Sequence, residues 1–161
     1  YVPLWVLINT LSLGTVSIFY SYMKQKDQND VGRYFKLKPE ELSKILFILS
    51  IFRNACAHDE RLFNLKCVKR DLKPNSIKDT TIHSILKIEK NSSNNYKSGK
   101  NDLFAIVIIF KLMLTKKSFN KFFFSLKELI DRLSKEIKTI TTHDVLEEMA
   151  FPVNWADIQK I

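Results

Sequence analysis

Apolar residues recur with helical spacing over much of the chain, and the pattern is clearest after Pro39. At 3.6 residues per turn, apolar positions at steps of three and four form one stripe along a helix. Glu40 and Glu41 fall in the first turn, where the helix dipole favours acidic side chains. We therefore predict an amphipathic helix over residues 39–58, or a turn beyond. Its predicted core stripe consists of Leu42, Ile45, Leu46, Leu49, Phe52 and Cys56.

Two shorter apolar helices are predicted before it, because residues 1–23 carry no charge. A proline suits the first turn of a helix over residues 3–11, and Ser12 can cap a second helix that ends near residue 23. An uncharged run of this length can also cross a bilayer, so a membrane-associated helical protein is one alternative. The break at Ser12 and Gly14 instead favours two helices buried in the core, with no membrane contact.

Polar stretches separate the remaining predicted elements. Residues 24–36 are interpreted as a connecting loop, and Pro74 breaks a weakly patterned region that contains a short amphipathic segment over residues 81–88. Residues 91–101 form a polar, low-complexity tract, which we predict to be a mobile loop. We expect no function to depend on the conformation of this tract.

Three further helices are predicted towards the carboxyl end. Asp102 can cap a helix over residues 103–114, which is apolar enough to be a central core helix. An amphipathic helix covers about residues 118–138, and Thr142 caps a short helix through Met149. The inward positions of the long helix are Phe122, Leu126, Leu129, Ile130 and Leu133. Its other face carries Lys121, Lys127, Lys135 and Lys138, a pattern more typical of a solvated face than of a binding surface.

The composition agrees with these elements and bounds the architecture. Gly and Pro are scarce, with 3 and 4 residues, which favours helices over a turn-rich β architecture, so we predict an all-α fold. A length of 161 residues suits one domain, 1–161. Because the first residue is Tyr1 rather than Met, we expect a piece of a longer protein. Cys56 and Cys67 form no CxxC pair or disulfide framework, which indicates a reducing compartment, the cytoplasm.

The net charge of the chain indicates which classes of partner it can bind. Lys and Arg outnumber Asp and Glu by 26 to 17, which gives a net charge of +9, as expected of a protein that meets phosphates or anionic membranes. Ordinary solubility is the alternative explanation. Arg is rare among the basic residues, and two of the few arginines are Arg53 and Arg61. A guanidinium can contact a phosphate through two hydrogen bonds, which an ammonium cannot.

One polar stripe is predicted at the end of the 39–58 helix. Asn54 and His58 are four residues apart, and Arg61 follows after three more, so their side chains share one face if the helix continues that far. Arg53 lies roughly 100° from Asn54, on the flank of this stripe. Cys56 falls on the opposite, apolar side, where we expect it to pack in the core.

These residues resemble a known ribonuclease motif. Arg53, Asn54 and His58 match the R-x4-to-6-H motif of HEPN ribonucleases, and the string over residues 53–64 is close to the R-N-x-x-A-H-x-x-R-L-x-N signature of the Abi-like (AbiD and AbiF, abortive infection) family. The strings over residues 3–15 and 151–155 are also similar to that family. The resemblance implies an all-α, HEPN-like helical bundle. Members are typically longer at the amino terminus, which makes this domain the carboxyl-terminal part.

The resemblance implies a metal-independent endoribonuclease of bacterial antiphage or toxin type. The 2′-hydroxyl of RNA is the nucleophile, His58 moves protons, and Arg53 stabilises the phosphorane. Asn54 would orient the imidazole or a phosphate oxygen, and the product would be a 2′,3′-cyclic phosphate. Arg53 and His58 are about 140° apart on a helix, so a homodimer with a composite site is expected. Arg61 and Asn64 would then bind RNA or the partner at the edge of the cleft.

Two alternatives stand beside the nuclease. The first is a non-catalytic HEPN-like RNA-binding or regulatory module whose motif stabilises the fold or the dimer. In the second, His58 merely complements the helix dipole while Arg53 pairs with Asp59 or Glu60 in a solvated cluster. No spacing of His, Cys or acidic residues resembles a metal site, so we expect no metal and no cofactor. A regulatory RNA or antitoxin is the expected restraining partner.

Overall fold

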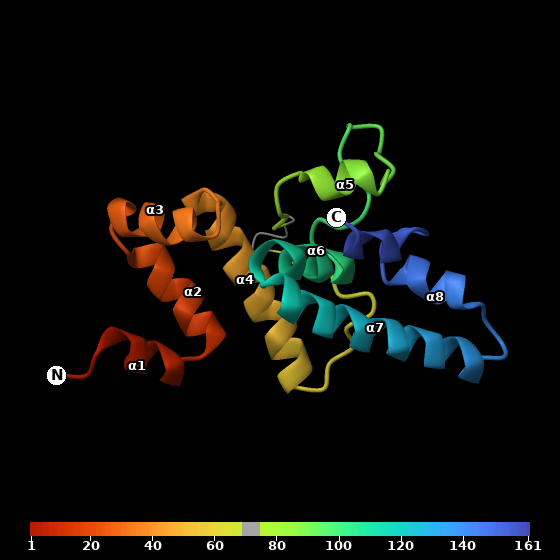
Figure 1. The fold of residues 1–161 in the computed structure, drawn as a ribbon, viewed down its shortest axis with the longest axis horizontal. Helices are drawn as coiled ribbons and strands as arrows, with labels where there is room; N and C mark the ends of the chain where they lie inside the picture. The colour runs from red at the N-terminus through yellow and green to blue at the C-terminus, as the bar shows by residue number, and fades with distance from the viewer. Residues whose placement is uncertain (69–74) are drawn as a thin grey trace.

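The computed structural model describes residues 1–68 and 75–161, and this part of the chain is built from helices (Figure 1). It contains no β-strand, and one isolated antiparallel bridge joins Lys90 and Tyr96. The predicted all-α fold is confirmed, while the predicted break at Pro74 lies outside the described residues. In chain order the helices are α1 (Leu4–Thr10), α2 (Leu13–Tyr22), α3 (Gln25–Tyr34), α4 (Pro39–Ala57), α5 (Thr81–Ile85), α6 (Leu103–Met113), α7 (Lys116–Glu136), α8 (Thr142–Glu148) and the 3-10 helix η1 (Trp155–Gln159).

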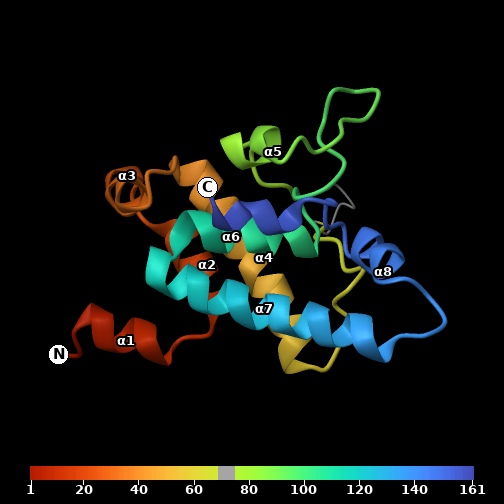
Figure 2. The ribbon, with the colours of Figure 1, turned by 45° about the vertical axis from the view of Figure 1, so that its right-hand side comes forward.

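Helix α6 is the centre of the core, as the sequence predicts. Every side chain from Phe104 to Ile109 is buried, so α6 is covered on all sides. Asp102 caps the helix, because its carboxylate accepts a hydrogen bond from the backbone N–H of Ala105 at 3.0 Å. Helices α4 and α7 both pack against α6 and enclose it from two directions (Figures 1 and 2).

Helix α4 begins at Pro39 as predicted, but its core stripe differs at the carboxyl end. The buried side chains include Ile48 and Ala55, whereas Cys56 is exposed. The prediction that Cys56 packs in the core is wrong. The end of α4 projects from the lower side of the molecule in both ribbon views, so only one side of its last turn meets other helices (Figures 1 and 2).

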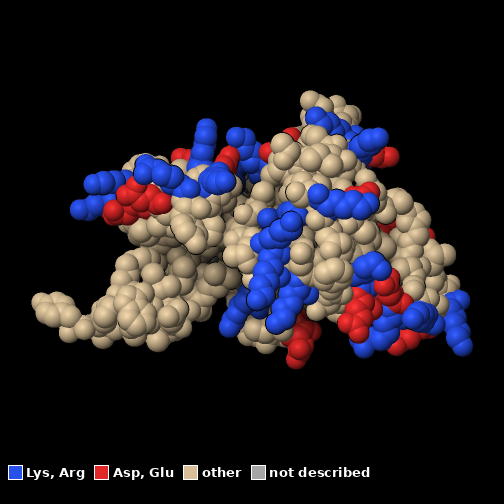
Figure 3. All heavy atoms as spheres, viewed as in Figure 1, with Lys and Arg blue, Asp and Glu red and all other residues tan. Residues whose placement is uncertain are grey.

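The amino-terminal helices are capped as predicted, but α1 is not part of the core. Ser12 caps α2, since its hydroxyl accepts a hydrogen bond from the N–H of Thr15 at 3.1 Å. Helix α2 packs on α4 and buries Ser17 and Tyr20. Helix α1 buries no residue, and Trp5 is 71% exposed, because α1 extends away from the bundle (Figure 1). This corner of the molecule is uncharged in Figure 3.

Residues 24–36 form helix α3 rather than the predicted loop. The segment has few apolar residues, so its helix is stabilised mainly by polar contacts and by packing against α4. The Gln28 amide donates to the backbone oxygen of Tyr20 at 2.9 Å, and the Tyr20 hydroxyl donates to the backbone oxygen of Gln28 at 3.0 Å. Asp27 in the first turn and Arg33 in the last complement the helix dipole. A search for apolar periodicity misses a helix of this kind.

Helix α7 follows the prediction in position, with two corrections. Its cap is Thr115, whose hydroxyl accepts from the N–H of Ser118 at 3.3 Å, so the helix starts before Ser118. The buried face consists of Phe119, Phe123 and Ile130, and Leu129 is 53% exposed. The expected inward position of Leu129 is wrong because it lies about 100° from Ile130 around the helix. The other predicted inward residues, Phe122, Leu126 and Leu133, are half-buried flanks.

The carboxyl-terminal elements close the bundle over α7. Helix α8 is capped by Thr141, one residue before the predicted cap, because the Thr141 hydroxyl accepts from the N–H of Asp144 at 3.1 Å. Helix η1 packs against α7, and Trp155 and Ile158 are buried there. No helix in the described residues is long and apolar enough to span a membrane.

The polar tract over residues 91–101 has an exposed tip and an anchored end. Gly99 is buried, and the ring of Tyr96 stacks on that of His83 with 4.8 Å between centroids. The Nε2 atom of His83 lies 2.9 Å from the backbone oxygen of Gly99. The tract therefore buries part of its length against α5. Mobility of its exposed part stays a prediction.

Candidate functional site at the end of helix α4

The motif residues lie where α4 ends. Arg53 and Asn54 are in its last turns, and His58 is the residue that caps its carboxyl end. The helix ends there because Asp59 adopts a left-handed conformation, with φ of 53°, and the N–H of Glu60 donates to the backbone oxygen of Ala55 at 2.9 Å. This is a Schellman-type ending, in which Asp replaces the usual Gly.

Within this site, Asn54 contacts the arginine rather than the histidine. The guanidinium Nη1 of Arg53 donates to the side-chain oxygen of Asn54 at 3.4 Å. Both side chains are exposed, and so is that of His58. Across residues 1–68 and 75–161, no hydrogen bond is made by the imidazole of His58, whose backbone N–H donates to the oxygen of Asn54 at 3.0 Å. The imidazole is thus accessible to a ligand, and Asn54 orients Arg53.

The predicted stripe of Asn54, His58 and Arg61 does not form on one helix. The stripe requires α4 to continue to Arg61, but α4 ends at Ala57. The guanidinium of Arg61 instead lies over the ring of Phe63, 5.4 Å from its centroid, as a cation–π pair. This part of the prediction is wrong, because the left-handed Asp59 turns the chain away from the helix axis.

Asn64 lies apart from the other motif residues. It lines a groove of about 760 Å³ that is bounded by residues 86–89, α8 and residues 150–154. The charged side chains of the groove have both signs, and two of them, Lys97 and Glu89, form an ion pair at 2.7 Å. The structure therefore places Arg53, Asn54 and His58 at the end of α4, with Arg53 in contact with Asn54, and it places Asn64 on a separate groove.

The arginine of the motif is not neutralised by the acids that follow it. Asp59 and Glu60 are both exposed, and in the described part of the chain neither lies within ion-pair distance of Arg53. The alternative in which Arg53 pairs with one of these acids does not match this geometry. Within residues 1–68 and 75–161, the Arg53 guanidinium has no carboxylate partner, and a guanidinium of this kind can bind an anionic group such as a phosphate.

A basic surface on α7 was not predicted as a binding surface. Figure 3 shows Lys and Arg side chains in a band down the middle of the molecule, over the region where α4 and the first half of α7 lie in Figure 1. The sequence contains a signal for it, because residues 103–127 include five lysines and no acidic residue. Helical periodicity alone assigns such lysines to a solvated face.

The comparisons with known proteins bear on the amino-terminal part of the chain. A family model described as Abi-like protein matches residues 1–64. Over this range the chain is similar to the Abi-like family. The matched region comprises α1 to α4 and the whole string over residues 53–64. The resembling string at 151–155 lies outside the match. No curated protein and no solved structure was found to match the chain.

Proposed function

We propose that this Abi-like protein is a metal-independent endoribonuclease that cleaves single-stranded RNA. The observation that carries the proposal is the exposed group of side chains at the end of α4, where Arg53 contacts Asn54 and lies close in sequence to His58, whose imidazole makes no hydrogen bond to the described residues. Arginine and histidine are the two groups that cleavage of RNA by its own 2′-hydroxyl requires. The family match over these residues supports an abortive-infection setting.

In the proposed reaction, the imidazole of His58 accepts the proton of the 2′-hydroxyl. The 2′-oxygen then forms a bond with the adjacent phosphorus, and the Arg53 guanidinium stabilises the charge of the phosphorane. The bond between phosphorus and the 5′-oxygen breaks, and that oxygen takes a proton from a second, protonated imidazole. The products are a 2′,3′-cyclic phosphate and a 5′-hydroxyl end. Asn54 acts as a positioning residue, because it contacts Arg53.

The proposed site is composite and lies between two copies of the chain. Positions five apart on a helix are separated by about 140°, so one copy presents Arg53 and His58 poorly to a single phosphate. A two-fold axis near the end of α4 would supply a second arginine and the second imidazole that the reaction needs. Support comes from the projection of this end from the bundle, which leaves it accessible to another copy (Figure 2).

The proposed ribonuclease also needs a partner that restrains it and a compartment in which it meets its substrate. An unrestrained ribonuclease harms its host, so we propose a regulatory RNA or an antitoxin protein as the partner that holds the enzyme inactive. The site of action is the cytoplasm, where the substrate RNA is found. Arg61 and Asn64 would contact RNA beyond the scissile phosphate, with Asn64 on the adjacent groove.

The test is cleavage of labelled single-stranded RNA in EDTA by the wild type, Arg53→Ala and His58→Ala. Matched controls are Arg33→Ala and Arg132→Ala, each of which removes an exposed arginine away from the end of α4. We expect cyclic-phosphate ends from the wild type and both controls, and a loss of about 100-fold or more in each motif variant. Unchanged cleavage in both motif variants would exclude this site.

A non-catalytic RNA-binding module is the second candidate, and the basic band in Figure 3 favours it as an alternative. The same experiment separates the two functions. RNA that is bound but not cleaved by the wild type, under every condition in which the chain is folded, supports the binding module and contradicts the nuclease.

A further inference from the structure

Three exposed lysines at the start of α7 have no acidic partner among the residues that the structure describes. Lys116, Lys117 and Lys121 are exposed, and among the described residues no carboxylate lies within ion-pair distance of any of them. The nearby Lys111 is different, since its ammonium lies 4.7 Å from the centroid of the Phe119 ring. Lys117 and Lys121 share one face of the helix, and Lys116 lies about 100° from Lys117 on the flank of that face, so the three cations form a curved surface that attracts a polyanion.

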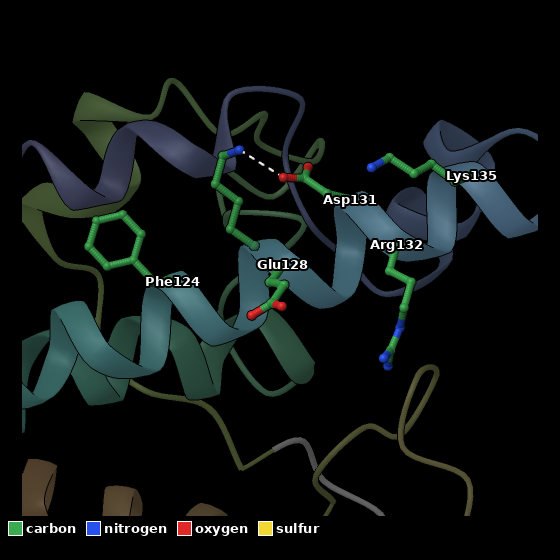
Figure 4. A pocket seen from close by; sticks show the side chains of 6 residues that line it. Phe124, Glu128, Asp131, Arg132 and Lys135 are labelled. Atoms are coloured by element: carbon green, nitrogen blue, oxygen red, sulfur yellow. Dashed lines mark hydrogen bonds and ion pairs between the residues drawn. The ribbon is translucent and has the colours of Figure 1, made fainter.

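An exposed aromatic ring continues this surface. Phe124 is 56% exposed and lies three residues after Lys121 and seven after Lys117, so all three share one face of α7. Its ring packs edge-on against the buried Phe123, with 5.9 Å between centroids, which holds the ring in place. Figure 4 shows the Phe124 ring standing out from the helix at one end of an open hollow. A fixed, exposed ring is a surface on which a nucleobase can stack.

The surface ends beyond Phe124. Glu128 follows one turn later, and Lys127 is paired with Asp131 at 2.9 Å (Figure 4). The hollow next to Phe124 is therefore lined by charges of both signs, which gives it no preference for phosphate. The unneutralised lysines lie on the other side of Phe124, towards the start of α7 and the band that runs down over α4 in Figure 3.

We propose that Lys116, Lys117, Lys121 and Phe124 form a track that holds single-stranded RNA, with the ammonium groups on phosphates and one base stacked on Phe124. We call it the α7 track. It extends the proposed nuclease by placing the RNA outside the scissile phosphate, and it rests on RNA being the substrate. Because lysine contacts and stacking read no base edges, the track binds RNA with little sequence preference.

The test is the affinity of the full chain for a fluorescein-labelled single-stranded RNA, measured by anisotropy over a range of salt concentrations. All proteins carry His58→Ala, so that no RNA is cleaved. One variant replaces Lys116, Lys117 and Lys121 by Ala, and its control replaces Lys24, Lys26 and Lys138, three exposed lysines elsewhere. We expect a loss of at least tenfold for the track variant, and a salt slope lower by about 2, since each contact contributes roughly 0.7.

Stacking is tested separately at Phe124. Phe124→Leu keeps an apolar side chain without a π face, and we expect a loss of affinity of about 5-fold to 100-fold with an unchanged salt slope. Phe124→Trp should restore binding, and Leu129→Ala, at a comparably exposed position of α7, should not change it. Thermal unfolding of all variants checks that they fold.

The affinities of these variants decide whether the α7 track exists. Equal losses in the track variant and its lysine control would overturn the track, as would identical affinities of Phe124→Leu and Phe124→Trp. Loss of binding to phosphatidylserine vesicles without loss of RNA binding would assign the lysines to a membrane surface and overturn the proposal. The result for the track does not depend on nuclease activity, because RNA binding is measured with proteins that carry His58→Ala.

Discussion

Gly99 is a position where the structure leaves no room for a side chain. Its φ is +75°, and an added Cβ would lie 2.7 Å from Cδ1 of Ile108 and 3.3 Å from Nε2 of His83. We expect Gly99→Ala to lower the free energy of unfolding by about 2–4 kcal/mol, from backbone strain together with overpacking. Urea unfolding measures this change.

The matched control for this prediction is Gly14→Ala. Gly14 lies in α2, and its added Cβ would meet only Ser12 Oγ, at 3.8 Å. Because Ala is the better helix former, we expect a gain of up to about 1 kcal/mol in the free energy of unfolding. A similar effect of the two substitutions would contradict the close packing around Gly99.

His83 makes the stability of the fold depend on pH. It is fully buried, and its Nδ1 accepts from the N–H of Thr80 at 3.1 Å, so the neutral ring carries its proton on Nε2 and donates to Gly99. Burial lowers the pKa of His83 below its ordinary value of 6.5. The unfolded chain then binds the proton more readily than the folded one, so this contribution is present above about pH 6.5 and is lost as the pH falls below it.

We therefore expect the free energy of unfolding to fall between about pH 6.5 and pH 5, by at most about 1.4 kcal/mol per pH unit. His83→Gln should flatten this dependence, whatever its effect on stability at neutral pH. His143→Gln, at an exposed position, serves as the control and should leave the dependence in place. A wild-type protein with equal stability at both ends of this range would refute the assignment.

At the scale of the elements, local features such as helix caps are easier to predict from the sequence than features that depend on tertiary contacts. Ser12 and Asp102 cap α2 and α6 as the sequence predicts, because a cap depends only on residues within a few positions. The burial of α1 was predicted wrongly and the helix α3 was missed, because these depend on contacts with distant segments. The exposure of Cys56 has the same origin, since it depends on where α4 leaves the bundle.

Asp102 joins the α6 cap to the tract before it, so its loss should cost more than that of an ordinary cap. Its carboxylate accepts from the N–H of Gly99 at 2.9 Å as well as from Ala105, and it is 4% exposed. Asp102→Ala leaves the buried N–H of Gly99 without its partner, whereas the N–H of Ala105 keeps a bond to the backbone oxygen of residue 102 at 3.1 Å, and we expect a loss of about 2–4 kcal/mol in the free energy of unfolding. The exposed cap variant Ser12→Ala should cost about 1 kcal/mol or less. Equal losses would show that the link to Gly99 adds nothing.

At the scale of the molecule, the motif can be recognised in the sequence, whereas the basic surface can be recognised only in the folded structure. The string over residues 53–64 is readable in the sequence, and α4 keeps Arg53, Asn54 and His58 together. Arg61 and Asn64 do not continue this helix because Asp59 adopts a left-handed conformation and turns the chain away. The hydrophobic periodicity of the sequence does not indicate this conformation. The α7 track depends on which lysines lack acidic neighbours, and that requires the folded arrangement of the chain.

The composite site predicts that two inactive chains restore each other. A mixed dimer of Arg53→Ala and His58→Ala chains retains one arginine and one histidine on different copies. Such a dimer can be isolated with a different affinity tag on each chain. We expect its RNA cleavage to exceed that of either parent by at least about tenfold, because each parent lacks either the arginine or both imidazoles of one site. Its activity should stay below that of the wild type, since it holds only one of the two imidazoles that the reaction uses.

The decisive comparison keeps the number of groups constant. A dimer of the wild-type chain with the double variant Arg53→Ala, His58→Ala also has one arginine and one histidine, but on the same copy. If the 140° separation on α4 prevents one copy from serving a single phosphate, this dimer should be the less active of the two. Activity only in the same-copy dimer, or cleavage by a chain that is monomeric in solution, would remove the second copy from the mechanism. The similarity to the Abi-like family over residues 1–64 would be unaffected by either result, since it does not depend on a dimer.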